Sequence, residues 1–201
     1  MAPADEDELA DMIATGLDFQ GPAFVRYPRG NAVGTKIKYA PVAIEIGESK
    51  RLQSGQDIDI WAIGSMVADA EKLALQLHEH NIDAGVVNAR FVKPLDTKRL
   101  SESAQSASLI VSMEDQVITG GLGTAIMEAL QESKIACPVQ RIGWPDAFID
   151  HGDSVTELRK ENGLSSEQIL DIVLARFRQT EAGEGVASEE INTQSRKDKV
   201  S

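Results

Sequence analysis

The chain has 201 residues, 42% of them hydrophobic, and a formal net charge of −12. This length corresponds to one domain of ordinary size with some additional chain, and the apolar fraction is sufficient for a buried core. The negative charge argues against nucleic acid and anionic membrane surfaces as partners, and no apolar run approaches the roughly 18 residues of a membrane-spanning segment.

The first 30 residues predict a helix followed by a strand. An acidic run at residues 5–8 suits the positive end of a helix dipole, and the apolar residues after it have helical spacing: Leu9, Met12, Ile13 and Leu17. Residues 23–26 predict a short strand. One helix and one strand cannot bury their own apolar faces, so we expect an exposed apolar face here, with self-association or poor solubility. We expect no secretory signal, because the chain does not open with a basic stretch and an apolar run.

Residues 57–143 alternate between predicted strands and predicted helices. Strands are expected at residues 57–64, 83–91, 108–114 and 137–143. Of the helices between them, the first carries Val67, Ala70, Ala74 and Leu77 on one face, and the others cover residues 96–107 and 123–133. Strands that are almost continuously apolar, separated by helices of about 10–15 residues, are typical of βαβ units.

The predicted fold class is therefore α/β, with a mostly parallel open sheet and helices on both faces, preceded by the helix and strand remnant. An earlier strand at residues 42–46 is expected to pair at the edge of the sheet. Two short helices should follow the sheet, because Ser154-x-x-Glu157 and Ser165-x-x-Gln168 have the spacing of a capping box.

Residues 181–201 contain no aromatic and few aliphatic side chains. This composition predicts a disordered tail. We interpret its charged cluster at residues 196–199 as a solvated chain end, not as a binding patch.

Two features near the third predicted strand suggest ligand chemistry. The glycine-rich stretch at residues 119–125 lies between a strand and a helix, where a phosphate could use free N–H groups, or where the glycines simply allow a tight loop. It matches neither of the common nucleotide-binding patterns. Glu114 and Asp115 end the strand at the edge where open α/β sheets place ligands; the alternative is that they cap the next helix.

Four cations also lie where predicted strands end. Arg90 and Lys93 could bind an anion, or could pair with the acids Asp96 and Glu114 across an interface. Arg26 and Arg29 flank Tyr27-Pro28. An arginine in this position is suited to bidentate binding of a phosphate or carboxylate, and a structural salt bridge is the alternative.

The histidines and the single cysteine give weaker signals. His78 and His80 are expected on the surface at a helix end, and His151 in a loop, so no metal site is predicted. Cys137 is the only cysteine, which excludes an intrachain disulfide and favours a reducing, cytoplasmic location.

Four stretches together closely resemble a known family in their order and spacing. They are V-R-Y-P-R-G-N-A-V-G at 25–34, V-N-A-R-F-V-K-P-L-D at 87–96, V-S-M-E-D-Q-V-I-T-G-G-L-G-T-A-I-M-E-A-L at 111–130 and I-G-W-P-D-A-F-I-D-H-G at 142–152. The chain, over residues of about 8–178, resembles the C-terminal third of the 1-deoxy-D-xylulose-5-phosphate synthase family, which belongs to the transketolase-like, thiamine-diphosphate-dependent enzymes. Transketolases and the β subunits of 2-oxoacid dehydrogenases share the domain but spell R-Y-P-R-G and R-F-V-K-P-L-D differently.

The resemblance implies a domain organisation. Residues 1–30 would be the C-terminal end of a pyrimidine-binding domain, and residues 31–41 a linker. Residues 42–180 would form a transketolase C-terminal domain, followed by the tail at 181–201.

The resemblance also implies a reaction and one substrate-binding residue. Members of the family join pyruvate, after loss of CO2, to glyceraldehyde 3-phosphate, and so make 1-deoxy-D-xylulose 5-phosphate for isoprenoid, thiamine and pyridoxal synthesis. Arg29 would hold the phosphate of glyceraldehyde 3-phosphate, with Arg26 and Tyr27 as supports. No catalytic or metal-binding residue is expected on this chain.

The family's cofactor chemistry needs parts that this sequence does not contain. Complete members carry an upstream domain whose G-D-G…N motif holds Mg²⁺ and thiamine diphosphate, and a glutamate that activates the cofactor. Here the only Gly-Asp pair, Gly152-Asp153, is followed by Ser154. We therefore expect both cofactors in the complete enzyme and neither on this chain, which should be inactive alone.

Three functional hypotheses follow. The chain is the C-terminal part of the synthase, acting with the N-terminal portion or with a second copy in a homodimer. Alternatively, it is a stand-alone dimerisation or regulatory module that docks on a thiamine-diphosphate enzyme. The third hypothesis, a 2-oxoacid dehydrogenase β subunit, is disfavoured by the R-Y-P-R-G spelling and by the missing pyrimidine-binding domain.

Overall fold

The centre of the molecule is a five-stranded sheet with the strand order β1-β3-β2-β4-β5. The computed structural model describes residues 1–29, 33–149 and 154–183. The strands are β1 (Lys50–Gln53), β2 (Ile58–Ala62), β3 (Ala84–Asn88), β4 (Leu109–Val117) and β5 (Val139–Trp144). β2 pairs in parallel with β3 and β4, and β4 in parallel with β5, whereas β1 runs antiparallel to β3. The predicted α/β class with a mostly parallel open sheet is confirmed.

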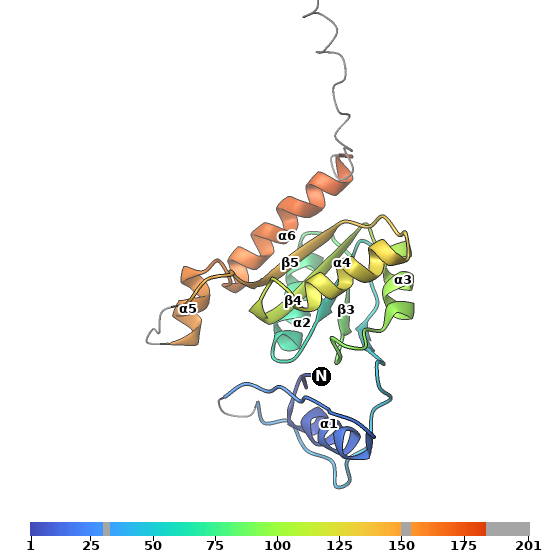
Figure 1. Ribbon diagram of the computed structural model, residues 1–201. Coiled ribbons are helices and arrows are strands. Elements are labelled where there is room, and N and C mark those ends of the chain that lie inside the picture. Colours follow the sequence, from blue (N-terminus) through green and yellow to red (C-terminus); the bar gives the residue numbers. More distant parts are fainter. Residues whose placement is uncertain (30–32, 150–153, 184–201) are drawn as a thin grey trace, which may run out of the picture.

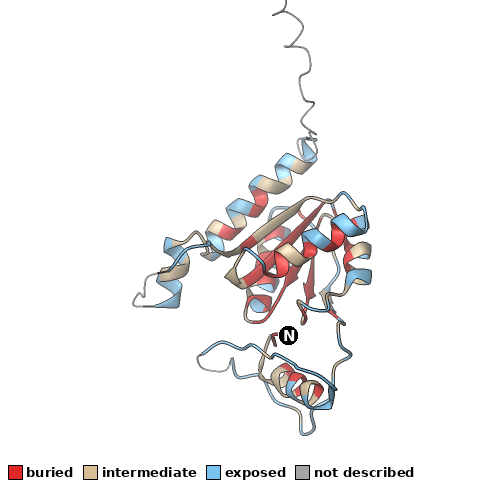
Figure 2. Ribbon diagram, in the orientation of Figure 1, coloured by how far each residue is buried: buried red, intermediate tan, exposed pale blue. Residues whose placement is uncertain are grey.

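Helices cover both faces of this sheet (Figure 1). Helices α2 (Met66–Glu79) and α6 (Ser166–Glu181) pack on one face, where Ile60, Val86 and Val111 point. Helices α3 (Thr97–Ser106) and α4 (Leu122–Glu132) pack on the other, against Trp61 and Ile110. Because β2 and β3 are buried along their whole length (Figure 2), their residues are apolar on both faces except for Asp59 and Asn88, which are buried and paired.

The helix caps follow the predicted spellings, with one difference in length. Ser165 caps α6 with a complete capping box that includes Gln168. Ser154 caps α5 (Val155–Glu161) by accepting a hydrogen bond from the backbone N–H of Glu157 at 3.2 Å. The prediction of two short helices is wrong for α6, which has 16 residues, because its apolar stripe continues over the sheet face it covers.

Two predicted strands do not form. Residues 23–26 are not a strand, and their backbone hydrogen bonds are to Met1: the Met1 amino group donates to the Phe24 carbonyl at 2.9 Å, and the Arg26 N–H to the Met1 carbonyl at 3.0 Å. Residues 42–46 are not a strand, since the N–H groups of Val42 and Ile44 are bonded to α1 side chains. The edge position that was predicted for them belongs to β1.

The N-terminal segment, residues 1–49, is built differently from the rest, which we call the body. Its helix α1 (Glu6–Asp18) lies outside the layers of the body, beyond the carboxyl edge of the sheet, with the N-terminus between the two (Figure 1). The chain after residue 32 runs along α1 toward β1. Four α1 side chains accept hydrogen bonds from backbone N–H groups of this stretch: Glu6 from Gly34, Asp7 from Lys38, Asp11 from Val42 and Thr15 from Ile44.

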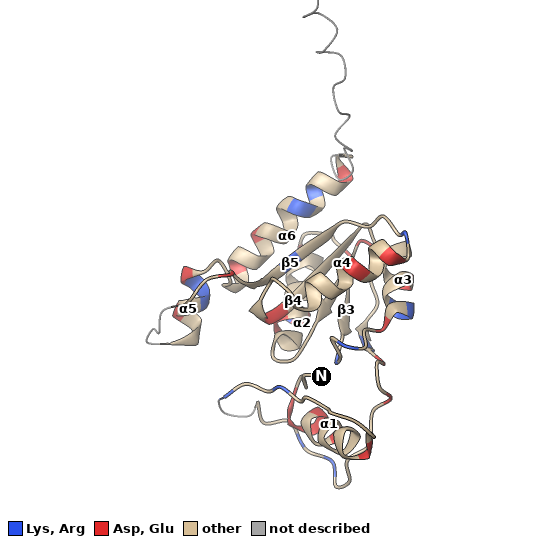
Figure 3. Ribbon diagram, viewed as in Figure 1, with Lys and Arg blue, Asp and Glu red and all other residues tan. Residues whose placement is uncertain are grey.

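Charge reinforces this packing of the chain against α1. Acidic side chains lie along α1, and basic ones lie in the chain beside it (Figure 3). Lys38 Nζ contacts Asp7 at 2.6 Å and Asp11 at 2.7 Å. The hydrogen bonds that Lys38 Nζ donates to Asp11 and Asp7 raise the pKa of Lys38, and the one that Asp7 accepts from Lys38 lowers the pKa of Asp7.

Parts of two predictions lie outside the described residues. These are the disordered tail, apart from its first three residues, and the loop that contains His151. In the described part of the chain, no helix combines the length and apolarity needed to cross a bilayer.

Candidate functional site

The carboxyl edge of the sheet is shaped by a bulge in β4. Met113 pairs with Ile142, and Val117 with Trp144. Between these pairs β4 has three residues, Glu114 to Gln116, and β5 has one. Such bulges re-aim side chains, and here three consecutive polar side chains turn toward three different parts of the molecule.

The first of them, Glu114, occupies the N-terminus of α4. Its carboxylate is 1% exposed and accepts hydrogen bonds from the backbone N–H groups of Leu122 at 2.8 Å and Gly123 at 3.0 Å. A Cβ at Gly121 would collide with this carboxylate, so the glycine there provides its space. The interpretation of Glu114 as a helix cap is confirmed.

This cap bears directly on the phosphate site considered for residues 119–125. The N–H groups that would bind a phosphate are already used by an internal anion, and a second negative charge beside Glu114 would be repelled. The glycine-rich loop is therefore a tight turn around a carboxylate. By the same observation, the diphosphate of a cofactor does not fit at this helix start.

Asp115 acts as a junction between three elements. Its carboxylate accepts hydrogen bonds from Trp144 Nε1 at 2.7 Å and Ser65 Oγ at 3.2 Å, and it lies 3.3 Å from Arg159 Nη2. Arg159 also contacts Asp69 at 3.0 Å. The side chain thus joins the end of β5, the start of α2 and α5.

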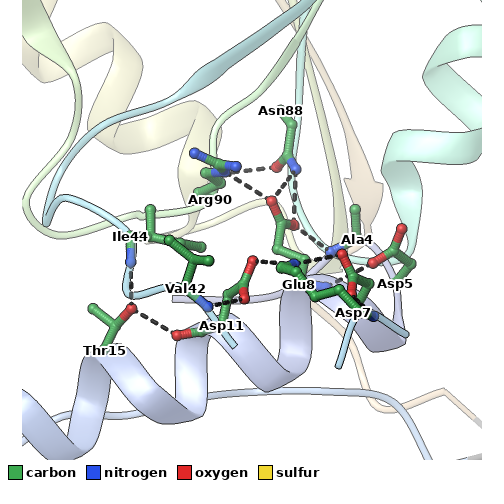
Figure 4. A network of polar contacts seen from close by, with 11 residues as sticks. Ala4, Asp5, Asp7, Glu8, Asp11, Thr15, Val42, Ile44, Asn88 and Arg90 are labelled. Atoms are coloured by element: carbon green, nitrogen blue, oxygen red, sulfur yellow. Dashed lines mark hydrogen bonds and ion pairs between the residues drawn. The ribbon is translucent and has the colours of Figure 1, made fainter. Parts of the chain in front are cut away.

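Arg90, at the end of β3, pairs with a residue that the sequence did not suggest. Its Nε lies 2.7 Å from Glu8 Oε1 on α1, and Asn88 Nδ2 donates to both oxygens of Glu8 at 3.0 and 2.9 Å. The N–H of Ala4 completes the set at 2.7 Å from Glu8 Oε2 (Figure 4). This buried cluster joins the N-terminal segment to the body.

The predicted pairing of Arg90 and Lys93 with Asp96 and Glu114 is wrong, because both acids have other partners. Glu114 caps α4, and Asp96 accepts bonds from Ser49 at 2.7 Å and from the Arg99 N–H at 3.0 Å. Lys93 is exposed. In the sequence, Glu8 is recognisable only as a carboxylate in the first turn of a helix, and a favourable interaction with the helix dipole is sufficient to explain it. No sequence pattern distinguishes Asn88.

The two arginines of R-Y-P-R-G behave differently from each other. Arg26 Nη1 donates a hydrogen bond to Gln116 Oε1, the third side chain of the bulge. Arg29 is exposed, and within the described ranges its side chain makes no hydrogen bond or ion pair. Arg26 is therefore held by an amide, and the guanidinium of Arg29 faces solvent.

A cavity of about 590 Å³ lies between the N-terminal segment and the body. Its wall includes Tyr27 and Pro28 on one side and Asn88 and Arg90 on the other, with acidic side chains of α1 between them. Asn88 Nδ2 and Arg90 Nε are already paired with Glu8. The cavity is thus a mixed-charge space beside R-Y-P-R-G, not a converging set of free donors.

The remaining candidates are unremarkable in their surroundings. His78 and His80 are exposed, as expected. Cys137 is half-buried, and burial raises the pKa of its thiol to about 11, far from that of a reactive thiolate. Among the residues that the structure describes, no group of three or more His, Cys, Asp or Glu side chains is arranged to hold a metal ion.

Helix α1 turns part of its apolar face outward. Its buried residues are Glu8, Asp11, Met12 and Thr15. Ile13 is 48% exposed and Leu17 80% exposed. The same outward exposure continues along the segment at Phe19, Phe24, Tyr27, Val33, Ile37, Tyr39, Val42 and Ile46, and we call these ten residues the apolar row.

Comparison of the chain with known proteins identifies the family to which it belongs. Residues 47–169 match the model of the transketolase C-terminal domain. The chain is 44% identical over 171 residues to a 1-deoxy-D-xylulose-5-phosphate synthase of Acidobacterium capsulatum, and 45% identical over 171 residues to one of Methylacidiphilum infernorum. Each match covers 85% of this chain and 27% of the relative, so the chain spans about a quarter of these synthases.

A solved structure agrees with the sequence relatives. A split-gene transketolase, in an inactive beta4 tetramer, is 27% identical with a TM-score of 0.74, and the match covers 88% of this chain and 56% of that one. The chain belongs to the transketolase C-terminal domain family, and it is similar to the C-terminal portion of 1-deoxy-D-xylulose-5-phosphate synthases.

Proposed function

We propose that the chain is the C-terminal part of a 1-deoxy-D-xylulose-5-phosphate synthase. This enzyme is a transferase that joins pyruvate, with loss of CO2, to glyceraldehyde 3-phosphate, for isoprenoid, thiamine and pyridoxal synthesis. Identity of 44–45% to such synthases supports the assignment. The single cysteine agrees with work in the cytoplasm, a reducing compartment.

The apolar row is the observation that carries the proposal. A helix that buries carboxylates and exposes Ile13 and Leu17 has its hydrophobic face ready for a partner. So many exposed large apolar side chains in one segment are unfavourable in a chain that works alone. The partner we propose is the N-terminal portion of the same enzyme, in a homodimeric assembly, because the segment would complete the domain whose end it forms.

Arg29 is the proposed anchor of the substrate phosphate. Its guanidinium faces solvent, whereas that of Arg26, three residues earlier, is held by Gln116. A planar guanidinium offers two parallel N–H donors to a phosphate, which a lysine cannot match. The apolar partner and the phosphate site would then be adjacent on the same segment.

Thiamine diphosphate and Mg²⁺ would be held by the remainder of the enzyme. The helix start that could attract a diphosphate on this chain is filled by Glu114. The cofactor supplies the carbon–carbon chemistry, and this chain contributes packing surface and the phosphate anchor. Alone, it should turn over neither substrate.

Reconstitution tests the proposal. The chain is mixed with a separately made N-terminal portion, thiamine diphosphate and Mg²⁺, and CO2 release from pyruvate is followed with glyceraldehyde 3-phosphate present. We expect activity only in the mixture, and a loss of roughly tenfold to 100-fold in kcat/KM for Arg29→Ala, the range for a charged hydrogen-bonded contact. Arg178→Ala, an exposed arginine on α6, is the matched control and should leave the rate unchanged.

The second candidate function, a stand-alone dimerisation or regulatory module, draws on the same apolar row. It predicts an inactive mixture in which the chain nevertheless binds a complete thiamine-diphosphate enzyme. Sedimentation of the chain with such an enzyme, with and without Leu17→Lys in the row, distinguishes the two functions.

A further inference from the structure

A continuous line of polar contacts connects R-Y-P-R-G with the start of α4. Arg26 Nη1 donates to Gln116 Oε1, and Gln116 Nε2 donates to Glu114 Oε2 at 2.6 Å. Glu114 in turn accepts from the N–H groups of Leu122 and Gly123. Residues that are 90 positions apart in sequence are thus joined through one amide side chain.

The inner half of this line is fixed by its surroundings. Glu114 is buried, and the glycines at positions 121 and 143 leave room for it: a Cβ at Gly143 would lie 3.2 Å from Glu114 Cγ and 2.9 Å from the Gln116 carbonyl oxygen. The β4 bulge, which includes both Glu114 and Gln116, sets their directions. The amide of Gln116 therefore presents its oxygen to the N-terminal segment from a rigid support.

The charges along this line of contacts favour the hydrogen bond between Gln116 and Arg26. The N-terminus of α4 carries partial positive charge and holds the Glu114 carboxylate. That carboxylate accepts from the Gln116 amide and polarises it, so that the amide oxygen becomes a better acceptor for a guanidinium. Of the two arginines in R-Y-P-R-G, Arg26 is the one that reaches this oxygen.

Holding Arg26 restricts where Arg29 can lie. The backbone of this stretch is bonded to Met1 on both sides of Val25, through the Phe24 carbonyl and the Arg26 N–H. Pro28 fixes its own φ and restricts Tyr27 before it. With Arg26 anchored at its side chain and its N–H, few conformations remain for Tyr27 and Pro28, the two residues that lead to Arg29.

We propose that Gln116 and Glu114 are positioning residues for the phosphate anchor: through Arg26 they hold R-Y-P-R-G in the orientation that Arg29 needs to bind the substrate phosphate. The proposal rests on the function proposed above for Arg29. It assigns to two body residues, outside the segment that touches substrate, a role in affinity for the phosphorylated aldehyde.

The first test uses this chain alone. The Arg26 amide, which is bonded to the Met1 carbonyl, is followed by hydrogen exchange in the wild type, Gln116→Ala and Glu114→Gln. We expect exchange to quicken by roughly two- to tenfold in Gln116→Ala, the effect of losing one hydrogen bond. Glu114→Gln keeps the shape of the side chain and should give a smaller change in exchange.

Gln179→Ala, on the exposed side of α6, is the control for this experiment. Unchanged exchange in Gln116→Ala, with the protein folded by circular dichroism, overturns the proposal.

The second test uses the reconstituted mixture. Gln116→Ala should raise the KM for glyceraldehyde 3-phosphate roughly tenfold, below the roughly 100-fold that misplacement of a reacting group can cost. The KM for pyruvate and the kcat should change little, a split that simple destabilisation does not produce. Equal loss with both substrates overturns the positioning role. If the wild-type mixture is inactive while exchange in Gln116→Ala is faster, the Arg26 anchor stands, and the proposed reaction alone fails.

Discussion

The body and the N-terminal segment are held together by opposite means. The body buries its apolar strands between two layers of helices, and most of its buried polar groups are paired, with Arg99 Nε and Ser112 Oγ as exceptions. The segment instead buries carboxylates of α1 against backbone N–H groups, and most of its large apolar side chains, Met12 excepted, are exposed. Among the residues that the structure describes, ten of the fifteen large exposed hydrophobic residues lie in this segment, between positions 13 and 46.

The difference shows what each region requires. The body buries most of its large apolar side chains between its own layers, as a packed core does. The segment pairs most of its polar groups with its own chain, which helps to hold that chain in place, but it leaves most of its large apolar side chains exposed, so that little hydrophobic burial stabilises it. Its structure is therefore that of a surface prepared for a partner.

The largest expected effect concerns a buried ion pair of the body. Asp59, 1% exposed on β2, contacts Arg51 at 2.6 Å across β3, where Gly85 leaves room for the two side chains. Asp59→Ala leaves the Arg51 side chain, 26% exposed, with Ser103 Oγ as its remaining partner, and should lower the free energy of unfolding by about 3 kcal/mol, the low end for breaking a buried pair because Arg51 is partly solvated. Urea unfolding followed by the fluorescence of buried Trp61 measures it. Asp171→Ala, on the exposed side of α6, should stay within about 0.5 kcal/mol. A loss below 1 kcal/mol for Asp59→Ala would mean that the pair adds little to the body.

Next comes the reactivity of Cys137, which reports on how closed the body is. Burial raises the pKa of its thiol to about 11, which makes the thiolate roughly 100-fold scarcer at neutral pH than that of a solvent-exposed cysteine. Reaction with a disulfide reagent at pH 8 should be slower than that of a free thiol by at least this factor. The rate should recover in denaturing urea. A native rate equal to that in urea would contradict a closed body.

A smaller effect is expected at the junction between the two regions. Glu8→Ala leaves Arg90 and Asn88 without their shared carboxylate, which should cost about 1–3 kcal/mol. The loss should be local: limited proteolysis of the N-terminal segment should accelerate while the urea midpoint of the body changes little. Glu8→Gln keeps an acceptor oxygen, so its rate of proteolysis should lie between those of the wild type and Glu8→Ala. If Glu8→Ala lowered the urea midpoint of the body as far as Asp59→Ala does, the two regions would unfold as one unit. That result would contradict the distinction between them.

The smallest effect on stability belongs to the apolar row. Ile13→Lys and Leu17→Lys change exposed positions and should alter unfolding by no more than about 0.5 kcal/mol. They should nevertheless reduce self-association of the chain in analytical ultracentrifugation. Leu75→Lys, at an exposed leucine on α2 of the body, is the control and should leave association unchanged. Equal association in all three variants would remove the row as a contact surface.

Much of the body could be predicted from sequence because its information is local. Each strand from β2 to β5 is a short apolar run, and the caps Ser154 and Ser165 have local spellings. The strand at the sheet edge was misplaced to residues 42–46, since edge pairing depends on what else can satisfy the backbone. Here α1 side chains take those N–H groups.

The site was less predictable for a related reason. The R-Y-P-R-G arginines and Glu114 could be singled out from their positions after strands. The bulge that turns Glu114, Asp115 and Gln116 in separate directions depends on the pairing of β4 with β5, which leaves no local pattern. The orientation of α1 could not be read from its periodicity either, because a helix with both an apolar and an acidic stripe does not specify which stripe meets the body.

The carboxylate at the start of α4 has a consequence for how this loop can change over generations. Gly121 is required by the acid that fills its Cβ position, not by its own backbone geometry, which is an extended one. An alanine at position 121 is therefore harmful while Glu114 is present, and it becomes sterically admissible once that side chain is shortened and the Gln116 amide, 2.5 Å from the added Cβ, moves aside. Substitutions at these two positions should therefore occur in a fixed order. Glu114 is replaced first and Gly121 second, because replacing Gly121 first would produce a steric clash.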